Sequence, residues 1–129
     1  MHIVLDTNVL VSGVFWSGSS HTILELWAKG ELGFIVSEAI LKEYGRVMDV
    51  VSAQRAESTL GDKWATFIAQ NAVVVDAPRI SSECRDPDDD KCAVAGRASY
   101  LVSGDRDLLR LKKAFGIPIV SPSHFLNLL

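Results

Sequence analysis

The sequence predicts an α/β fold in which helices cover a mostly parallel sheet of about five strands. Short, uniformly apolar runs recur along the chain at 3–5, 34–36, 73–75, 100–102 and 117–120. Because polar residues do not alternate with apolar ones in these runs, they are typical of strands buried on both faces of a parallel sheet. Segments with helical patterning separate the runs without a repeat or a linker, so we expect a single domain, 1–129.

Helices are expected in the intervals between these strands and after the last one. The first stops near Gly13, the second runs from Ser19 or Ser20 to Gly30, and the others lie near 38–48, 53–70, 88–99, 106–113 and after 122. Side chains that can cap helix N-termini precede several of them: Ser19 or Ser20, Ser37, Asp86 and Ser121. Pro118 cannot donate a backbone hydrogen bond, so the last strand is expected at an edge of the sheet.

Composition narrows the class of protein. The chain has 129 residues, of which 48% are hydrophobic and 22% charged, and its formal net charge is −3, so contacts to a polyanion must be local. Cys84 and Cys92 match no zinc-binding spacing and are too few for a disulfide framework. No apolar run approaches the ~20 residues of a membrane span, and no basic leader is evident. We therefore expect a cytoplasmic protein without a membrane anchor.

Asp6, Thr7 and Asn8 follow the first predicted strand directly. In open α/β sheets, functional groups gather at the carboxyl ends of the strands. A carboxylate delivered there by a buried strand is a candidate for chemistry. The alternative is that Asp6 caps the helix that follows.

Glu43 and Glu38 lie on different faces of the third predicted helix. Glu43 borders its apolar stripe, whereas Glu38 faces away with Lys42 four residues further on, as in an ordinary exposed ion pair. Glu43 is therefore expected to point toward the sheet. The alternative is that its carboxylate reaches water or pairs with Arg46.

Four aspartates at 86–90 open a helix that is apolar on most sides. Acidic residues in a first turn complement the helix dipole by roughly 0.3–1 kcal/mol each, and this is expected to account for Asp86 and Asp88. Asp89 and Asp90 lie deeper, and Asp90 shares a face with apolar residues. A carboxylate on a buried face needs a partner, which Lys91 alone does not provide.

The fourth predicted strand is followed by Ser103 and Asp105, in the same arrangement as the opening of the chain. Asp105 is the preferred candidate for the site, while Asp107 supports it or caps the next helix. One pocket can then collect four carboxylates, those of Asp6, Glu43, Asp90 and Asp105. Carboxylates about 4 Å apart repel by about 4 kcal/mol per pair at an effective dielectric near 20. A hard divalent cation, Mg²⁺ or Mn²⁺, would neutralise such an all-oxygen cluster and activate water for phosphodiester hydrolysis.

Four segments together resemble a PIN domain: Ile-Val-Leu-Asp-Thr-Asn-Val-Leu, the stretch 37–43, Asp-Pro-Asp-Asp-Asp-Lys, and Tyr-Leu-Val-Ser-Gly-Asp-Arg-Asp-Leu-Leu. The similarity covers nearly the whole chain. It is greatest to the prokaryotic PIN proteins that are regarded as toxins of toxin–antitoxin systems and are related to VapC. It implies a three-layer α/β/α sandwich and a Mg²⁺- or Mn²⁺-dependent endoribonuclease. It also implies a homodimer whose activity is silenced by an antitoxin.

The resemblance also assigns roles to individual residues. The catalytic acids, which also bind the metal, are Asp6, Glu43, Asp90 and Asp105, with Asp89 and Asp107 as further metal ligands. The polar residues expected to support the site are Thr7, Asn8 and Ser103. Lys91 and Arg106, with Arg110, lie near the proposed site and are candidates for contacts to substrate phosphates. The alternative for each is a solvated surface position or an ion pair. The alternative function is a catalytically weak PIN domain that binds RNA or protein. A dehalogenase-like hydrolase is disfavoured because Asn8 stands where its second aspartate is needed.

Overall fold

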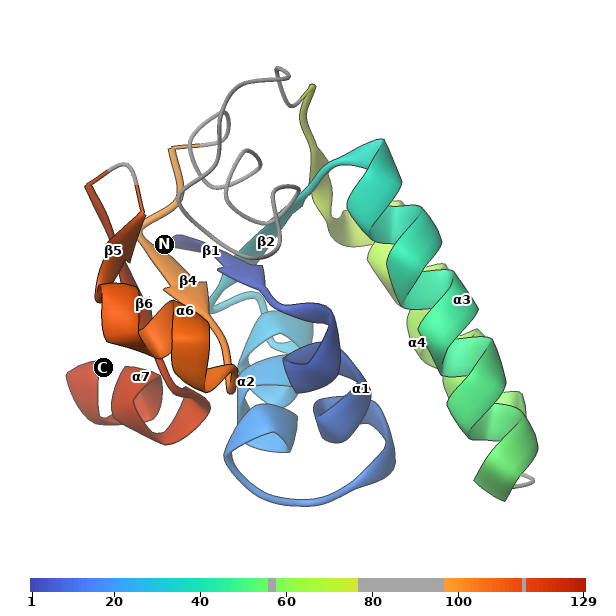
Figure 1. The fold of residues 1–129 in the computed structure, drawn as a ribbon. Coiled ribbons are helices and arrows are strands. Elements are labelled where there is room, and N and C mark those ends of the chain that lie inside the picture. Colours follow the sequence, from blue (N-terminus) through green and yellow to red (C-terminus); the bar gives the residue numbers. More distant parts are fainter. Residues whose placement is uncertain (56–57, 77–96, 115) are drawn as a thin grey trace.

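The computed structural model describes residues 1–55, 58–76, 97–114 and 116–129 (Figure 1). Its six-stranded sheet has the order β3-β2-β1-β4-β6-β5. The strands are β1 (His2–Leu5), β2 (Gly33–Val36), β3 (Val73–Val74), β4 (Tyr100–Val102), β5 (Lys113–Ala114) and β6 (Ile117–Val120). All neighbours are parallel except β5 and β6, which are antiparallel. The predicted mostly parallel sheet is confirmed.

Helices cover the sheet on both faces. They are α1 (Thr7–Phe15), α2 (Ser19–Ala28), α3 (Glu38–Arg55), α4 (Ser58–Asn71), α6 (Arg106–Leu111) and α7 (Pro122–Leu128). The connections from β1 to β2 and from β2 to β3 step along the sheet in one direction, and the connection from β4 to β6 steps in the other. Because such crossovers are right-handed, α1 to α4 lie on one face and α6 on the opposite face. Within the described ranges, none of these helices is both long and apolar enough to cross a membrane.

The strand order reverses at β1, in the middle of the sheet. β1 pairs with β2 on one side and with β4 on the other, in the register Leu5 to Val102. The backbone N–H of Asp6 donates to the carbonyl of Val102 at 2.9 Å, which extends the pairing one residue past β1. The chain segments after β1 and β4 therefore start side by side and leave toward different faces, which is the arrangement that creates a crevice in open α/β sheets.

The core forms around β1, as its uniformly apolar sequence predicts. Ile3, Val4 and Leu5 are at most 1% exposed. Trp27 of α2 stacks on Phe34 of β2 with 3.9 Å between the ring centroids. Burying such large aromatic groups supplies much of the hydrophobic stabilisation of a domain of this size.

Some predicted helix boundaries are wrong. α1 continues past Gly13 to Phe15. Gly13 does not end the helix but allows α2 to pack closely, since a Cβ there would lie 2.8 Å from the Ser20 carbonyl oxygen. α3 does not end near Met48 but continues to Arg55, and α4 begins at Ser58. No glycine or proline lies between 49 and 55 to stop α3.

The structure differs from the predictions in other helices too. Gly18, not Ser19 or Ser20, is the N-cap residue of α2 and makes no side-chain capping bond. By contrast, Ser37 and Ser121 accept the predicted capping bonds, from Ile40 N at 3.1 Å and His124 N at 3.2 Å. The helix predicted at 88–99 lies mostly outside the described residues, and its described end, 97–99, is not helical.

β6 does not lie at the edge of the sheet, contrary to the prediction from Pro118. α6 ends at Leu111 because Lys112 adopts a left-handed conformation (φ 61°), and the chain then forms β5 along β6. Ile119 N donates to the Lys112 carbonyl at 2.8 Å. Pro118 precedes the two β6 residues that pair with β4, Ile119 and Val120, so its missing N–H removes no bond from that ladder.

Candidate active site at the carboxyl ends of β1 and β4

Asp6 is a buried carboxylate held by a serine from the neighbouring strand end. Its side chain is buried, with 7% of the residue exposed, and Oδ2 accepts a hydrogen bond from Ser103 Oγ at 2.8 Å. Asp6 occupies the N-cap position of α1 but makes no side-chain capping bond. The capping alternative therefore does not account for this carboxylate.

Thr7 connects α1 to Glu43 on α3. Its hydroxyl donates to Glu43 Oε2, and Thr7 is 5% exposed while Glu43 is half-buried. The carboxylate of Glu43 thus points to the end of β1, as its place beside the apolar stripe predicts. In the part of the chain that the structure describes, Glu43 has no cationic partner, so the alternative pairing with Arg46 is wrong.

Tyr44 fixes the position of Glu43 along the chain. Its hydroxyl donates to the carbonyl of Leu5 at 2.5 Å, and the side chain is buried. This bond ties α3 to the last residue of β1, immediately before Asp6. In the sequence, Tyr44 lies in the apolar stripe that Glu43 borders, and that pattern alone does not predict the bond to Leu5. The signal that could have found it is that a buried tyrosine needs a partner for its hydroxyl.

Ser103 also organises the segment after β4. Its fully buried hydroxyl accepts a hydrogen bond from Asp105 N at 3.0 Å, in addition to donating to Asp6. Asp105 is the N-cap of α6, and its Oδ1 accepts from Asp107 N at 2.8 Å. The alternative prediction, that Asp107 caps this helix, is wrong. Asp105 is the N-cap, and Asp107 lies in the first turn and is exposed.

The electrostatics around Asp6 suit a cation. The two ion pairs seen within the described ranges are exposed contacts on helix surfaces, Glu38 with Lys42 at 3.8 Å and Glu25 with His21 at 3.6 Å. The first confirms the predicted exposed pair. No described lysine, arginine or histidine forms an ion pair with Asp6, whose described side-chain partner is the Ser103 hydroxyl. The oxygen-only donors around it are those preferred by Mg²⁺ and related hard ions.

The described acids alone do not complete a metal site. Among residues 1–55, 58–76, 97–114 and 116–129, no three His, Cys, Asp or Glu side chains lie close enough to hold one ion. The predicted ligands Asp89 and Asp90 and the predicted phosphate contact Lys91 lie outside the described residues. Asp6, Glu43 and Asp105 therefore do not form a three-ligand metal group among the described residues.

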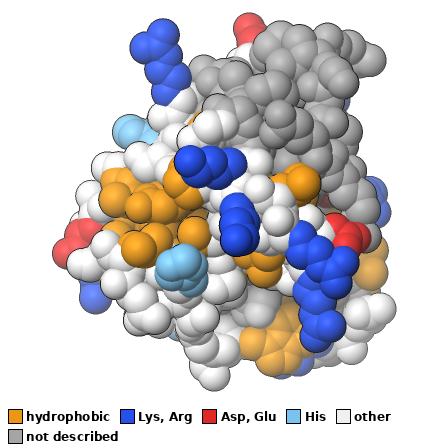
Figure 2. Space-filling view, turned by 60° about the vertical axis from the view of Figure 1, so that its left-hand side comes forward, with side chains coloured by type: hydrophobic (Ala, Val, Ile, Leu, Met, Phe, Trp, Pro, Cys, Tyr) orange, Lys and Arg blue, Asp and Glu red, His pale blue; other side chains and the backbone are white. Residues whose placement is uncertain are grey.

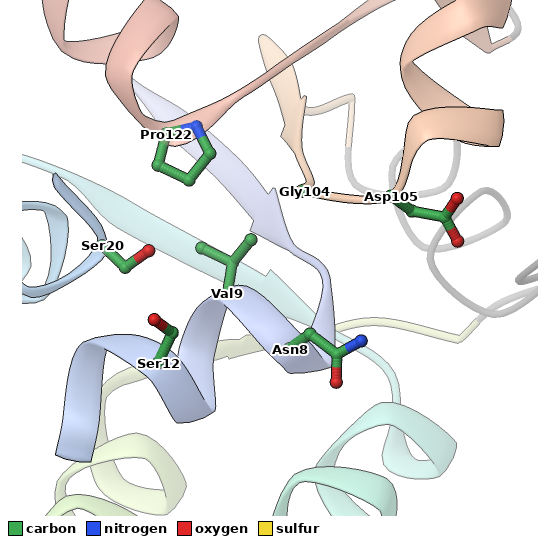
Figure 3. Close-up of a pocket in the computed structure, with 7 residues that line it drawn as sticks. All are labelled: Asn8, Val9, Ser12, Ser20, Gly104, Asp105 and Pro122. Carbon is green, nitrogen blue, oxygen red and sulfur yellow. The ribbon is translucent and has the colours of Figure 1, made fainter. Parts of the chain in front are cut away.

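A pocket of about 420 Å³ adjoins Asp105 (Figure 3). Asn8, which is exposed, and Asp105 line the same end of it. Arg106 and Arg110 are exposed on α6, directly after Asp105. The predicted site residues of the described ranges thus lie on segments that leave the same edge of the sheet or pack against it.

The fold and this site define an α/β protein with acidic residues at the switch point of a parallel sheet. The model of the PIN domain matches residues 2–107, and the chain belongs to the PIN domain family. PIN domains are generally nucleases that depend on divalent metal ions. No curated protein matches the chain.

A solved structure shares the fold. The chain superimposes on a chain in the crystal structure of VapBC2 from Rickettsia felis bound to a DNA fragment from their promoter, with a TM-score of 0.60. The identity is 19%, and the match covers 92% of this chain and 97% of that chain. The predicted α/β/α architecture is thereby confirmed.

Proposed function

We propose that this protein is a Mg²⁺- or Mn²⁺-dependent endoribonuclease and the toxin of a toxin–antitoxin pair. The observation that carries the proposal is the buried carboxylate of Asp6, which forms no ion pair among the described residues and lies on a segment hydrogen-bonded to those that carry Glu43 and Asp105. The hydroxyl of Ser103 donates to the Asp6 carboxylate and accepts the backbone N–H of Asp105, and the hydroxyl of the adjacent Thr7 donates to Glu43. Asp6 and Glu43 form no ion pair within the described ranges, and their described side-chain partners are hydroxyl groups. Oxygen ligands of this kind suit a divalent cation.

The metal would be held by Asp6, Glu43 and Asp105 together with Asp90, or Asp89, from the segment that the structure does not describe. Asp107 would bind the metal as a further ligand or would support the other ligands. When bound, a divalent ion supplies an activated water and stabilises the leaving oxygen during in-line attack on phosphorus. The protein's part is to orient the carboxylates, which Thr7 and Ser103 do through their hydroxyl groups, and Asn8 adds a polar group at the entrance.

Phosphate binding would fall to α6 and the segment after it. Arg106, Arg110, Lys112 and Lys113 are all exposed there. Residues 108–129 contain no acidic residue, so this part of the chain is positive although the whole chain has a formal charge of −3. Figure 2 shows lysine and arginine side chains gathered across this face. Such local cations provide sequence-independent contacts to the RNA backbone, and Lys91 would add another.

The proposed toxin function also implies protein partners. The shared fold with a chain of VapBC2 and the sequence resemblance to VapC-related toxins support a cognate antitoxin protein. We expect the toxin to act in the cytoplasm as a homodimer. A catalytically weak PIN domain would use the same surface to bind RNA or protein without cutting it.

An RNA cleavage assay tests the proposal. The wild-type protein is incubated with unstructured and structured RNA in Mn²⁺, in Mg²⁺ and in EDTA, beside the variants D6N and E38Q purified identically. Wild type and E38Q should cut RNA only with metal, while D6N should be inactive with an unchanged circular dichroism spectrum. Equal cleavage by D6N would contradict the assignment of Asp6 and point to a contaminating nuclease. Metal-independent RNA binding without cleavage would favour the binding module.

A further inference from the structure

The pocket beside Asp105 extends away from the acids, between α1, α2 and α7. Its described lining residues are Asn8, Val9, Ser12, Ser20, Gly104, Asp105 and Pro122. We propose that it holds the ribose and base of the nucleotide next to the scissile phosphate and thereby selects where RNA is cut. This inference rests on the proposed ribonuclease function and adds a specificity site to it.

The α1 wall of the pocket combines Val9 with the polar residues that this helix does not bury. The buried residues of α1 are Thr7, Val9, Leu10, Val11, Gly13, Val14 and Phe15. The two that remain, Asn8 and Ser12, are four positions apart and therefore lie on the same side of the helix. Both line the pocket. Since α1 is packed on its other sides, the orientation of these two side chains is fixed by the core.

The opposite wall comes from α2 and is held close to α1. Ser20 lies in the first turn of α2, and the close approach of the two helices at Gly13 sets its distance from Ser12. Figure 3 shows Ser12 and Ser20 together at one end of the pocket, with Asn8 and Asp105 toward the other. The pocket therefore has a hydroxyl-rich end remote from the acids and an end that meets them.

The lining chemistry fits a nucleoside better than a phosphate. Among the described lining residues none is a lysine or arginine, and Asp105 would repel a phosphate that lacks a bound cation. Hydroxyl and amide groups can bind the edges of a base and the ribose 2′-OH, the groups by which proteins recognise single-stranded RNA. Val9 and Pro122 supply apolar surface for the face of the ring. The volume of about 420 Å³ lies within the usual range for small-ligand sites.

The site therefore divides the substrate between two surfaces. Arg106 and Arg110 on α6 lie on the chain just after Asp105 and would take the backbone phosphates. The pocket on the other side of Asp105 would take one nucleoside. Asp105 lies at the boundary, where the bond to be cut must lie.

Two measurements test this inference. In the first, the wild type and the variants S12L, S20L and S17L cut an RNA library with random positions, and the cut ends are sequenced. Ser17 is exposed and does not line the pocket, so S17L is the matched control. The wild type and S17L should prefer one nucleotide beside the cut by about tenfold or more, and S12L and S20L should lose that preference. Unchanged preference in both pocket variants would overturn the proposal.

The second measurement does not require catalysis. Adenosine, guanosine, cytidine and uridine are titrated to about 10 mM into the wild-type protein in EDTA, and amide NMR shifts are recorded. At least one nucleoside should shift Ser12, Ser20 and Gly104, and S12L should abolish the effect. If no nucleoside shifts these amides, the pocket assignment is overturned. Shifts at these residues in a protein that cuts no RNA would support the pocket and refute the nuclease, so the two proposals fail separately.

Discussion

The hydroxyl of Ser103 donates a hydrogen bond to Asp6 Oδ2 at 2.8 Å, although 97 positions separate these residues in the sequence. Ser103 Oγ in turn accepts a hydrogen bond from the backbone N–H of Asp105 at 3.0 Å. One fully buried side chain thus joins the end of β1 to the segment after β4. The relative position of two proposed metal ligands depends on this serine.

Replacing Ser103 with alanine should therefore affect both stability and activity. S103A leaves the Asp6 carboxylate and the Asp105 N–H without their shared partner, which should lower the free energy of unfolding by about 1–3 kcal/mol. Cleavage should slow by about 10–100-fold, as when supports of metal ligands are removed. Urea unfolding and cleavage rates would be compared with S123A, which alters an exposed serine. Matching values for the two variants would refute the positioning role.

Thr7 offers a test of how Glu43 is oriented. T7V keeps the branched shape but removes the hydroxyl that donates to Glu43. Mn²⁺ affinity should fall about 10–100-fold, while T7S, which keeps the hydroxyl, should retain it. Isothermal titration measures the affinities. Equal Mn²⁺ affinity in T7V and T7S would show that this contact does not serve the metal.

Tyr44 should stabilise the junction of α3 and β1. Y44F leaves the buried carbonyl of Leu5 without this donor, so the free energy of unfolding should fall by about 1–3 kcal/mol. The control is Y100F, at a half-buried tyrosine for which the described contacts show no hydroxyl bond. The two variants would be compared by their midpoints of denaturant unfolding, provided that the dependence of the unfolding free energy on denaturant concentration has the same slope in both. No difference between them would mean that the Tyr44 hydroxyl does not hold α3 in place.

The cations of α6 should govern how RNA binding depends on salt. Each lost phosphate contact lowers the slope of log K against log salt concentration by about 0.7 for single-stranded RNA. R106Q and R110Q, made in the D6N background to prevent cleavage, should show this decrease by fluorescence anisotropy. K42Q should not, because Lys42 lies on α3 beside Glu38. An unchanged slope in both arginine variants would place the RNA elsewhere.

The main outline of the fold could be predicted because buried parallel strands leave a simple mark. The runs at 3–5 and 100–102 are apolar on both faces, and the polar residues that end them, Asp6 and Ser103, lie together because β1 and β4 are adjacent. Residue periodicity was also enough to separate exposed Glu38 from inward-pointing Glu43. These inferences use only local spacing and the geometry of parallel sheets.

The features that could not be predicted depend on contacts between distant segments. The bond from Tyr44 to Leu5 exists only because α3 crosses the end of β1. β5 has two residues and forms because Lys112 turns the chain back along β6. The C-terminal end of α3 is not evident from the sequence, because no glycine or proline lies between 49 and 55. Ser12 and Ser20 form one pocket only once α1 and α2 pack together at Gly13.

The most direct test of the account is Mn²⁺ binding to the metal-free protein, followed by calorimetry and by thermal unfolding. The wild type and E38Q should bind Mn²⁺ and gain about 2.7 kcal/mol of stability at a metal concentration 100 times the dissociation constant. D6N, E43Q and D105N should lose most of both effects while remaining folded. Equal Mn²⁺ binding by the wild type and D6N, or no binding by the wild type, would contradict the claim that these acids are gathered around a divalent cation.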